Sequence, residues 1–322
     1  MMRVLVSGAS GIVGRFVVEH FLAHGHEVVA GVRAGTSAPP VLQPSFSRPT
    51  FSRATFSRQV ETVPLSLDPA AAAPDFGGID AFVHAAFQHV PGRYRGGEGD
   101  DPEGFRRANL EGSLALFAAA RKAGVRRCVF LSSRAVYGRP PDGELLTEES
   151  EPAPESLYGR VKWETEQALA TMDGEDFVTA SVRATGVYGL LPGLPHKWEN
   201  LARDYLSGRP IADRVGTEIH GDDLAAAILL LLTADAALVA GRAFNASDLL
   251  TSRHEILSEL QQATTCIHPL PDPADPSGFA RMDTTRLRSL GWTPGGPERL
   301  RADIASLADR LATGDARSPA TD

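Results

Sequence analysis

The feature that most constrains the fold lies at the N-terminus, where the apolar segment 3–6 leads directly into the loop Ser7-Gly-Ala-Ser-Gly-Ile-Val-Gly14. The segment has no polar alternation, which predicts a strand buried on both faces, and residues 15–24 have the apolar spacing of a helix. Gly8 permits a tight turn, Gly11 lets a phosphate approach the backbone, and Gly14 lets the helix pack on the strand. Strand, loop and helix therefore predict a dinucleotide-binding unit. The cofactor contacts expected from this loop are Gly8, Ser10, Gly11, Ile12 and Gly14.

Composition restricts the kind of protein further. A chain of 322 residues, 43% hydrophobic and 22% charged, suits a sheet-centred α/β unit with an appended lobe. The net charge of −8 argues against nucleic acid or an anionic membrane as partner. No signal peptide or membrane span is expected, because the apolar stretch 224–233 is too short to cross a bilayer. Cys128 and Cys266 stand apart without a His/Cys cluster, so we expect no metal site and a cytoplasmic location.

The second predicted strand, residues 27–32, is followed by Arg33. An NAD-binding fold usually offers a carboxylate at this point, whereas an arginine suits the 2′-phosphate of NADP. The sequence therefore favours NADP over NAD, unless Arg33 is simply a solvated strand end. Residues 45–59 then repeat a five-residue unit containing Phe-Ser-Arg three times, which predicts a surface insertion. The alternative is that its arginines reach the adenosine phosphate.

Further buried segments predict the remaining strands of a parallel sheet, at residues 60–67, 79–83, 128–131 and 177–182. The fold class expected is a Rossmann, doubly wound, mostly parallel sheet. Ligands bind at the carboxyl ends of such strands. The residues expected there are Asp68 beside the adenine, Ala85 and Ala86 against the cofactor, and Ser132 and Ser133 after the fifth strand.

Two predicted helices carry polar residues that are candidates for a functional role. Asn109 lies within the helix expected at 105–123, where it is either exposed or holds a water or a backbone carbonyl. Tyr158 and Lys162 are one helical turn apart, and a nearby ammonium lowers the pKa of a phenol. The pair is therefore a candidate proton-transfer device. The preceding loop, residues 138–156, could close over a substrate.

The remainder of the chain predicts a second unit. We expect a nucleotide-binding domain at 1–185, to which the segments around 215–248 return, a substrate lobe at 186–312, and a frayed tail at 313–322. Helices are predicted at 198–207, 222–234 and 253–264. Lys197, Trp198, Arg203 and Arg209 are interpreted as a helix surface, with a role in lining the substrate cleft as the alternative.

These motifs together resemble the extended short-chain dehydrogenase/reductase family, the NAD(P)-dependent epimerase/dehydratase group. The resemblance is carried by Gly8, Gly11 and Gly14, His84-Ala85-Ala86, Asn109, Ser132 to Gly138, Tyr158 with Lys162, Arg183 to Gly189, His220 to Leu224 and Leu290 to Pro294. It implies a seven-stranded Rossmann sheet with a small C-terminal domain, commonly forming a homodimer.

The resemblance also implies residue roles. Ser133 would hydrogen-bond the substrate oxygen, Tyr158 would act as general acid/base, and Lys162 would bind the nicotinamide ribose and lower the pKa of the phenol. Asn109 would support the active-site helix and its water, and Arg183 would join the cofactor contacts. No metal is required.

Departures from the family pattern narrow the range of reactions and substrates. Arg134 and Ala135 stand where sugar-nucleotide dehydratases have an acidic pair, which argues against dehydration. Gly186 stands where nucleotide-sugar epimerases usually have Asn, and Gly216 where they have an arginine, for which Arg214 is a possible substitute.

Three functions follow as hypotheses. The first is an NAD(P)-dependent oxidoreductase of the epimerase/dehydratase type, acting on a sugar or nucleotide-sugar hydroxyl or ketone. The second is an NADPH-dependent carbonyl reductase for a non-sugar substrate, which Arg33 favours. The third is a non-catalytic dinucleotide sensor, against which the combination of Ser133, Tyr158 and Lys162 argues.

Overall fold

The computed structural model describes residues 1–33, 60–90 and 97–313, and its centre is a seven-stranded sheet. The strands are β1 (Arg3–Ser7), β2 (Glu27–Val32), β3 (Glu61–Pro64), β4 (Ala81–His84), β5 (Arg127–Ser133), β7 (Val178–Ala184) and β10 (Arg242–Ala246). Their order is β10-β7-β5-β4-β1-β2-β3, and each neighbouring pair is parallel. This arrangement confirms the predicted Rossmann sheet, with seven strands as the family resemblance implies.

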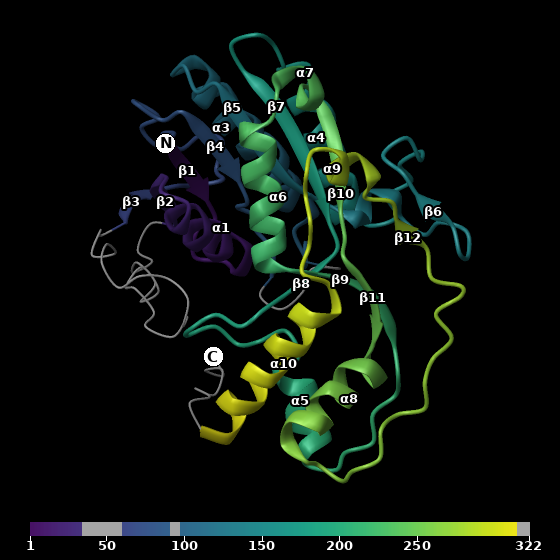
Figure 1. Ribbon diagram of the computed structural model, residues 1–322. Coiled ribbons are helices and arrows are strands. Elements are labelled where there is room, and N and C mark those ends of the chain that lie inside the picture. The colour runs from purple at the N-terminus through teal and green to yellow at the C-terminus, as the bar shows by residue number, and fades with distance from the viewer. Residues whose placement is uncertain (34–59, 91–96, 314–322) are drawn as a thin grey trace.

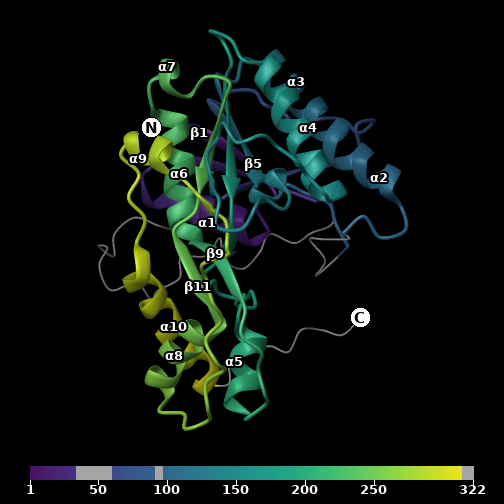
Figure 2. The ribbon, with the colours of Figure 1, turned by 90° about the vertical axis from the view of Figure 1, so that its right-hand side faces the viewer.

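Helices cover both faces of this sheet, as a parallel sheet requires. One face carries α1 (Ile12–Ala23), α6 (Gly221–Thr233), α7 (Ala236–Val239) and α9 (Thr285–Ser289), and the other carries α2 (Pro102–Arg106), α3 (Gly112–Lys122) and α4 (Leu157–Thr171). Figure 2 shows the two layers with the sheet between them. The helix expected at 105–123 begins earlier, at Pro102, and changes to a π-helical turn over Arg107–Glu111 before α3.

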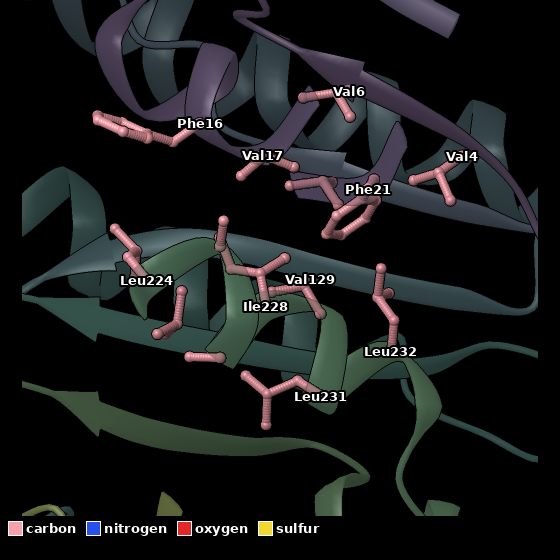
Figure 3. Close-up of a cluster of buried hydrophobic side chains, with 14 of the residues drawn as sticks. Val4, Val6, Phe16, Val17, Phe21, Val129, Leu224, Ile228, Leu231 and Leu232 are labelled. Atoms are coloured by element: carbon pink, nitrogen blue, oxygen red, sulfur yellow. The ribbon is translucent and has the colours of Figure 1, made fainter. Parts of the chain in front are cut away.

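The core between the sheet and its first helical layer is built from large apolar side chains. Phe16, Val17 and Phe21 of α1 face Leu224, Ile228, Leu231 and Leu232 of α6, with Val4, Val6 and Val129 of the sheet beside them (Figure 3). All of these side chains are buried. The apolar stretch that the sequence marked as a buried helix is therefore α6, and it attaches the C-terminal half of the chain to the first βα unit.

The C-terminal lobe contains its own small sheet and three helices. The sheet has the order β11-β9-β8, formed by β8 (Gly186–Tyr188), β9 (Val215–His220) and β11 (Leu249–Ser252). The helices are α5 (Glu199–Leu206), α8 (Arg253–Thr264) and α10 (Gly296–Thr313), which gather at the lower end of the molecule in Figure 1. Neither this sheet nor α10 was predicted. Whether the chain divides into units at residue 185 stays a prediction.

Other differences from the sequence predictions are local. The third strand, expected at 60–67, is limited to β3, because Leu65 turns into the core beneath Gly31. The loop at 138–156 contains the short strand β6 (Leu145–Leu146), which pairs with β12 (Arg281–Met282). The Phe-Ser-Arg repeat at 45–59 and the tail after residue 313 lie outside the described residues. Within the described part of the chain, no helix is long and apolar enough to cross a membrane.

Candidate active site

The glycine loop forms a close-packed cradle at the carboxyl ends of β1 and β4. Gly8 has a φ of +68°, and a Cβ on it would lie 2.8 Å from the backbone of Ala86. A Cβ on Gly14 would lie 2.1 Å from the Gly8 carbonyl oxygen, so helix and loop pack without side chains between them. Gly11 precedes α1 without a capping side chain, which leaves the first N–H groups of the helix directed at the loop. These residues fit a pyrophosphate group.

A chain of hydrogen bonds fixes the segment opposite the glycine loop. The Ser113 hydroxyl donates to the Asn109 carbonyl (2.6 Å), so its oxygen accepts from His84 Nε2 (2.8 Å). His84 Nδ1 then accepts from the Ser7 hydroxyl (2.7 Å), whose oxygen accepts from the backbone N–H groups of residues 85 and 86 (3.1 Å each). Burial, with the Lys162 charge adding to it, lowers the pKa of His84 to about 3. The imidazole is therefore neutral, and one tautomer satisfies the whole chain.

Asn109 lies in the π-helical turn and is buried, not exposed. Its Oδ1 accepts from the Gln88 backbone N–H (2.7 Å), and its Nδ2 donates to the Gln88 carbonyl (2.8 Å) and to the Phe105 carbonyl (2.9 Å). Of the two readings of this residue, the geometry agrees with a role in holding backbone groups. Single π turns occur frequently at functional sites, and this one holds the segment after β4 in place.

The structure brings Ser133, Tyr158 and Lys162 together at the end of β5. Lys162 Nζ donates to the Leu131 carbonyl (2.6 Å), two residues before Ser133. On the other side, a Cβ on Gly159 would lie 2.4 Å from the Ala135 carbonyl oxygen, so the start of α4 abuts the turn that follows Ser133. Ser133 and Tyr158 are both half-buried, and the Ser133 hydroxyl oxygen accepts from the Ala135 backbone N–H (3.1 Å).

Lys162 is an ammonium group in an almost dry environment. Its side chain is buried, with Nζ 4.3 Å from the Phe87 ring centroid and 6.0 Å from the Tyr158 ring centroid. Burial lowers the pKa of Lys162 to about 7, and the Glu166 carboxylate one turn further along α4 opposes this shift. Phe87 also packs edge-on against Tyr158, at 5.1 Å between centroids. Phe87 was not among the predicted site residues, although its place directly after the His-Ala-Ala segment was a signal for it.

Ser132 and Arg183 form a buried network behind this site. The Ser132 hydroxyl donates to Glu166, which also accepts from Nε and Nη2 of the Arg183 guanidinium at 2.7–3.2 Å. Arg183 also donates to the Tyr137 hydroxyl (2.8 Å) and is buried. Its donors are thus engaged by protein groups, so the cofactor contact expected for Arg183 is corrected to a structural one. The pairing of Ser132 with Glu166 agrees with Ser133 as the serine that faces the substrate.

The residues expected at the adenosine end are exposed. Arg33 directly follows β2. Gly31 of that strand pairs with Ser7 at the start of the glycine loop, and Arg33 lies two residues after Gly31. Asp68 pairs with Arg107 (3.2 Å) and accepts from the backbone N–H of residue 70. The contact of Asp68 with the adenine stays a prediction. No group of three or more His, Cys, Asp or Glu side chains among the described residues is placed to hold a metal ion.

The substrate side of the site lies where β7 continues into β8. Ala184 pairs with Ser133, and Gly186 follows two residues later. Lys197 precedes α5 and pairs with Glu218 of β9 beside Gly186, while Trp198 is buried against Tyr188. Trp198 is therefore not part of an exposed helix surface, whereas Lys197 is exposed and lies just before the helix. Glu218 was not singled out in the sequence, because its partner is 21 positions away.

Comparisons with known proteins agree with this geometry. Residues 4–247 match the model of the NAD dependent epimerase/dehydratase family. The chain is 29% identical over 343 residues to a UDP-glucose 4-epimerase of Streptomyces lividans, covering 95% of this chain and 94% of that protein. It is 30% identical over 178 residues to a putative dihydroflavonol 4-reductase of Synechocystis, covering 54% of this chain and 46% of that protein.

Solved structures share this fold. A UDP-glucose 4-epimerase from Thermotoga maritima, solved with UDP-glucose, has a TM-score of 0.72 at 20% identity and covers 98% of this chain and 100% of its own. A UDP-glucose 4-epimerase from Stenotrophomonas maltophila, with bound NAD and formylated UDP-arabinopyranose, has a TM-score of 0.75 at 22% identity with the same coverage.

Proposed function

The chain belongs to the NAD dependent epimerase/dehydratase family and is an NAD(P)-dependent enzyme of the extended short-chain dehydrogenase/reductase type, and from this premise we propose that it interconverts nucleotide sugars by hydride transfer at a ring carbon. UDP-glucose and UDP-galactose are the substrates to test first, since a relative aligned over 95% of the chain is named a UDP-glucose 4-epimerase. The observation that supports the proposal is the position of Lys162, whose Nζ donates to the Leu131 carbonyl on the strand ending at Ser133 and lies 6.0 Å from the Tyr158 ring centroid.

In the proposed mechanism the chain handles the proton and positions the substrate. The Tyr158 phenolate takes the proton from the substrate hydroxyl and later returns it, while the Ser133 hydroxyl donates a hydrogen bond to the same oxygen. The Lys162 ammonium favours the phenolate electrostatically. Its fixed bond to the Leu131 carbonyl holds this charge near the Tyr158 ring. A bound nicotinamide supplies the hydride acceptor and donor.

The test of this proposal is to denature freshly purified protein, identify any released nucleotide, and then assay UDP-galactose formation from UDP-glucose. An epimerase oxidises and re-reduces the same carbon, so turnover should proceed without net consumption of added cofactor. Consumption of NAD(P)H in step with product would refute epimerisation. Absence of any change in the nucleotide sugar, in protein loaded with cofactor, would refute the substrate.

We further propose NADP as the preferred cofactor. The support is Arg33, exposed directly after β2 where a cation suits the 2′-phosphate. The names of solved relatives point the other way, because the Thermus thermophilus UDP-glucose 4-epimerase is described as a complex with NAD. Competition between NAD and NADP for protein stripped of nucleotide decides between them.

The same arginine favours a second function, an NADPH-dependent carbonyl reductase for a non-sugar substrate. Such an enzyme exchanges its cofactor in every cycle, so the purified protein should contain little bound nucleotide and should oxidise NADPH with ketones or aldehydes. A partial match to a putative dihydroflavonol 4-reductase is compatible with this function. Retained stoichiometric nucleotide would exclude it.

Assembly and location are further proposals. A homodimer through helices that include α4 follows from the family resemblance, as does a substrate lobe built mainly from residues 186–312. The two cysteines, far apart in sequence, agree with a reducing cytoplasm. Light scattering of the purified protein measures the dimer directly.

A further inference from the structure

A charged pair lies beside Gly186, on the side of the site that is predicted to bind the substrate. Lys197 Nζ donates to Glu218 Oε2, and both groups border Gly186. A Cβ on Gly186 would lie 2.3 Å from Lys197 Nζ and 2.5 Å from Glu218 Oε2, although the backbone there is not strained. The two charged groups therefore fit at this point because residue 186 has no side chain.

A second glycine, Gly216, also lies beside Glu218. Gly216 precedes Glu218 by two residues on β9, so the two share one face of the strand. A Cβ on Gly216 would lie 3.7 Å from Glu218 Oε1, the carboxylate oxygen that does not receive the Lys197 bond. Gly186 and Gly216 are both only half-buried. Solvent or a ligand thus reaches the pair between two glycines.

The pair is held rigidly in this position. His196 Nε2 lies 2.8 Å from Asp303, and the Trp198 ring stacks on Tyr188 at 4.9 Å, so both neighbours of Lys197 are anchored in the interior. The Glu218 side chain is 11% exposed and that of Lys197 is 30% exposed. Ordering the lysine on ligand binding therefore costs little additional entropy.

The location places this pair next to the reacting centre. Gly186 lies two residues beyond Ala184, which is paired with Ser133, and Gly186 itself is paired with Glu218. An ammonium group donates and a carboxylate accepts, so together they match a group that offers an acceptor and a donor side by side. Two neighbouring hydroxyl groups of a sugar ring have this arrangement.

We infer that Lys197 and Glu218 form a recognition site for a vicinal diol of the substrate, in which Lys197 donates to one hydroxyl oxygen and the other hydroxyl donates to Glu218. The inference rests on the proposed nucleotide-sugar function and adds the residues that read its sugar hydroxyls. The diol belongs either to the hexose or to the ribose of the nucleotide.

The test measures equilibrium binding, so that it does not depend on turnover. Tyr158→Phe protein loaded with cofactor is titrated by calorimetry with UDP-glucose, UDP-3-deoxyglucose and 2′-deoxyuridine diphosphoglucose. The 3-deoxy sugar lacks both hexose diols, and the deoxyuridine compound lacks the ribose diol. Loss of the diol that the pair reads should weaken binding by about tenfold or more, because hydrogen bonds between the diol and two charged groups are lost.

The variants Lys197→Met and Glu218→Gln should each abolish that discrimination and bind the matching deoxy analogue as well as UDP-glucose. Burial already raises the pKa of Glu218 against the opposing Lys197 and Arg214 charges, so removing Lys197 weakens the acceptor as well as the donor. Arg301→Met with Glu259→Gln removes an exposed ion pair between α10 and α8 and is the matched control. It should leave the discrimination unchanged.

Gly216→Val keeps both charges but places a side chain beside Glu218 Oε1. It should also abolish the discrimination, and it keeps the inference testable if either charge variant fails to fold. The inference would be overturned if the Tyr158→Phe protein, with Lys197 and Glu218 intact, binds all three ligands equally. It would also be overturned if the Lys197 or Glu218 variants weaken the binding of all three ligands by one common factor, because this would indicate a packing contact. Discrimination without conversion of UDP-glucose to UDP-galactose in the unsubstituted enzyme would refute the proposed reaction and leave the diol site standing.

Discussion

Tyr158 is the residue on which the proposed chemistry depends most directly. Replacing it with Phe removes the hydroxyl and keeps the ring that packs against Phe87. General acid/base catalysis contributes about 10²–10⁴-fold to rate, so kcat of Tyr158→Phe should fall by at least about a hundredfold. Cofactor affinity, measured by fluorescence titration, should change little. Tyr137→Phe, which removes another hydroxyl outside the reacting group, is the comparison, and unaltered turnover in Tyr158→Phe would exclude the phenol from the mechanism.

Glu166 raises the pKa of Lys162 from one helical turn away. Burial lowers the pKa of Lys162 to about 7 and the Glu166 carboxylate opposes it, so Glu166→Gln should lower this pKa further. Lys162 would then lose its proton at a lower pH than in the unsubstituted protein. The chain has only three lysines, at 122, 162 and 197, so ¹³Cε-lysine NMR follows this titration directly. Glu164→Gln, on the same helix and paired with Arg106, is the control. An unchanged Lys162 titration in Glu166→Gln would contradict the assignment.

Arg33 decides the proposed cofactor preference. Arg33→Ala should weaken NADPH binding by about tenfold to a hundredfold and leave NADH binding unchanged, because a charge-assisted hydrogen bond to the 2′-phosphate would be lost. Arg126→Ala, on the loop before β5 and away from the glycine loop, controls for the loss of positive charge. Equal losses for the two nucleotides would reject the role of Arg33.

At the scale of elements, Gly112 makes the junction between the π-helical turn and α3 possible. A Cβ on Gly112 would lie 1.9 Å from the Leu67 carbonyl oxygen, so the helix packs directly on the segment between β3 and Asp68. Helix propensity alone predicts that Gly112→Ala stabilises the protein by about 1 kcal/mol. The contact predicts the opposite sign, a loss of about 1–3 kcal/mol from overpacking.

Chemical denaturation measures both quantities, with Ala115→Gly as the matched change at an exposed position of α3. That variant should lose about 1 kcal/mol through propensity. A Gly112→Ala protein as stable as the unsubstituted one would show that the junction can shift. The same close approach explains why the π turn was not predicted: it depends on a contact between residues 45 positions apart.

Elements with a strong local pattern could be predicted from the sequence, and those fixed by partners could not. The strand at 27–32 and the helix at 253–264 have the predicted bounds, because buried apolar runs and a Ser252 capping box define them locally. α10 was not predicted, although Leu300, Ile304 and Leu307 follow helical spacing. β8, β9 and β11 are short and pair mainly with one another, so their sheet required the tertiary fold.

The candidate site divides in the same way. Ser133, Tyr158 and Lys162 were predicted because their spacing and their position after a buried strand carry the signal. Arg183 was assigned to the cofactor, but it is buried against Glu166 of another element. Lys197 and Glu218 meet only after β8 and β9 pair, which no local pattern indicates.

At the scale of the whole molecule, the two halves of the site depend on how the lobe is attached to the sheet. Figure 1 shows α10 below α6, reaching into the lobe beside α8. Asp303 of α10 accepts from the Leu190 backbone N–H (2.9 Å) and lies 2.8 Å from His196 Nε2 and 3.6 Å from His220 Nε2. One buried carboxylate therefore joins α10, the loop before α5 and the end of β9.

Removing this carboxylate should destabilise the protein as a unit. Burial tends to raise the pKa of Asp303, but the hydrogen bonds and charges of His196 and His220 hold it well below its usual range. Asp303→Asn should lower the free energy of unfolding by about 2–4 kcal/mol at neutral pH, because buried partners lose their acceptor. Asp309→Asn, exposed on the same helix, should change it little.

The pH dependence gives the sign of the effect. Since the folded-state pKa of Asp303 is depressed, its stabilising contribution is complete above the ordinary carboxyl pKa of 3.8 and is lost as pH falls below that value towards the lowered pKa. The difference in unfolding free energy between Asp303→Asn and the unsubstituted protein, measured by urea denaturation, should therefore shrink as pH falls below 4. A difference that is already absent at pH 7 would mean that α10 is held by its apolar face alone, and that the lobe carrying Lys197 and Glu218 is positioned without the buried carboxylate.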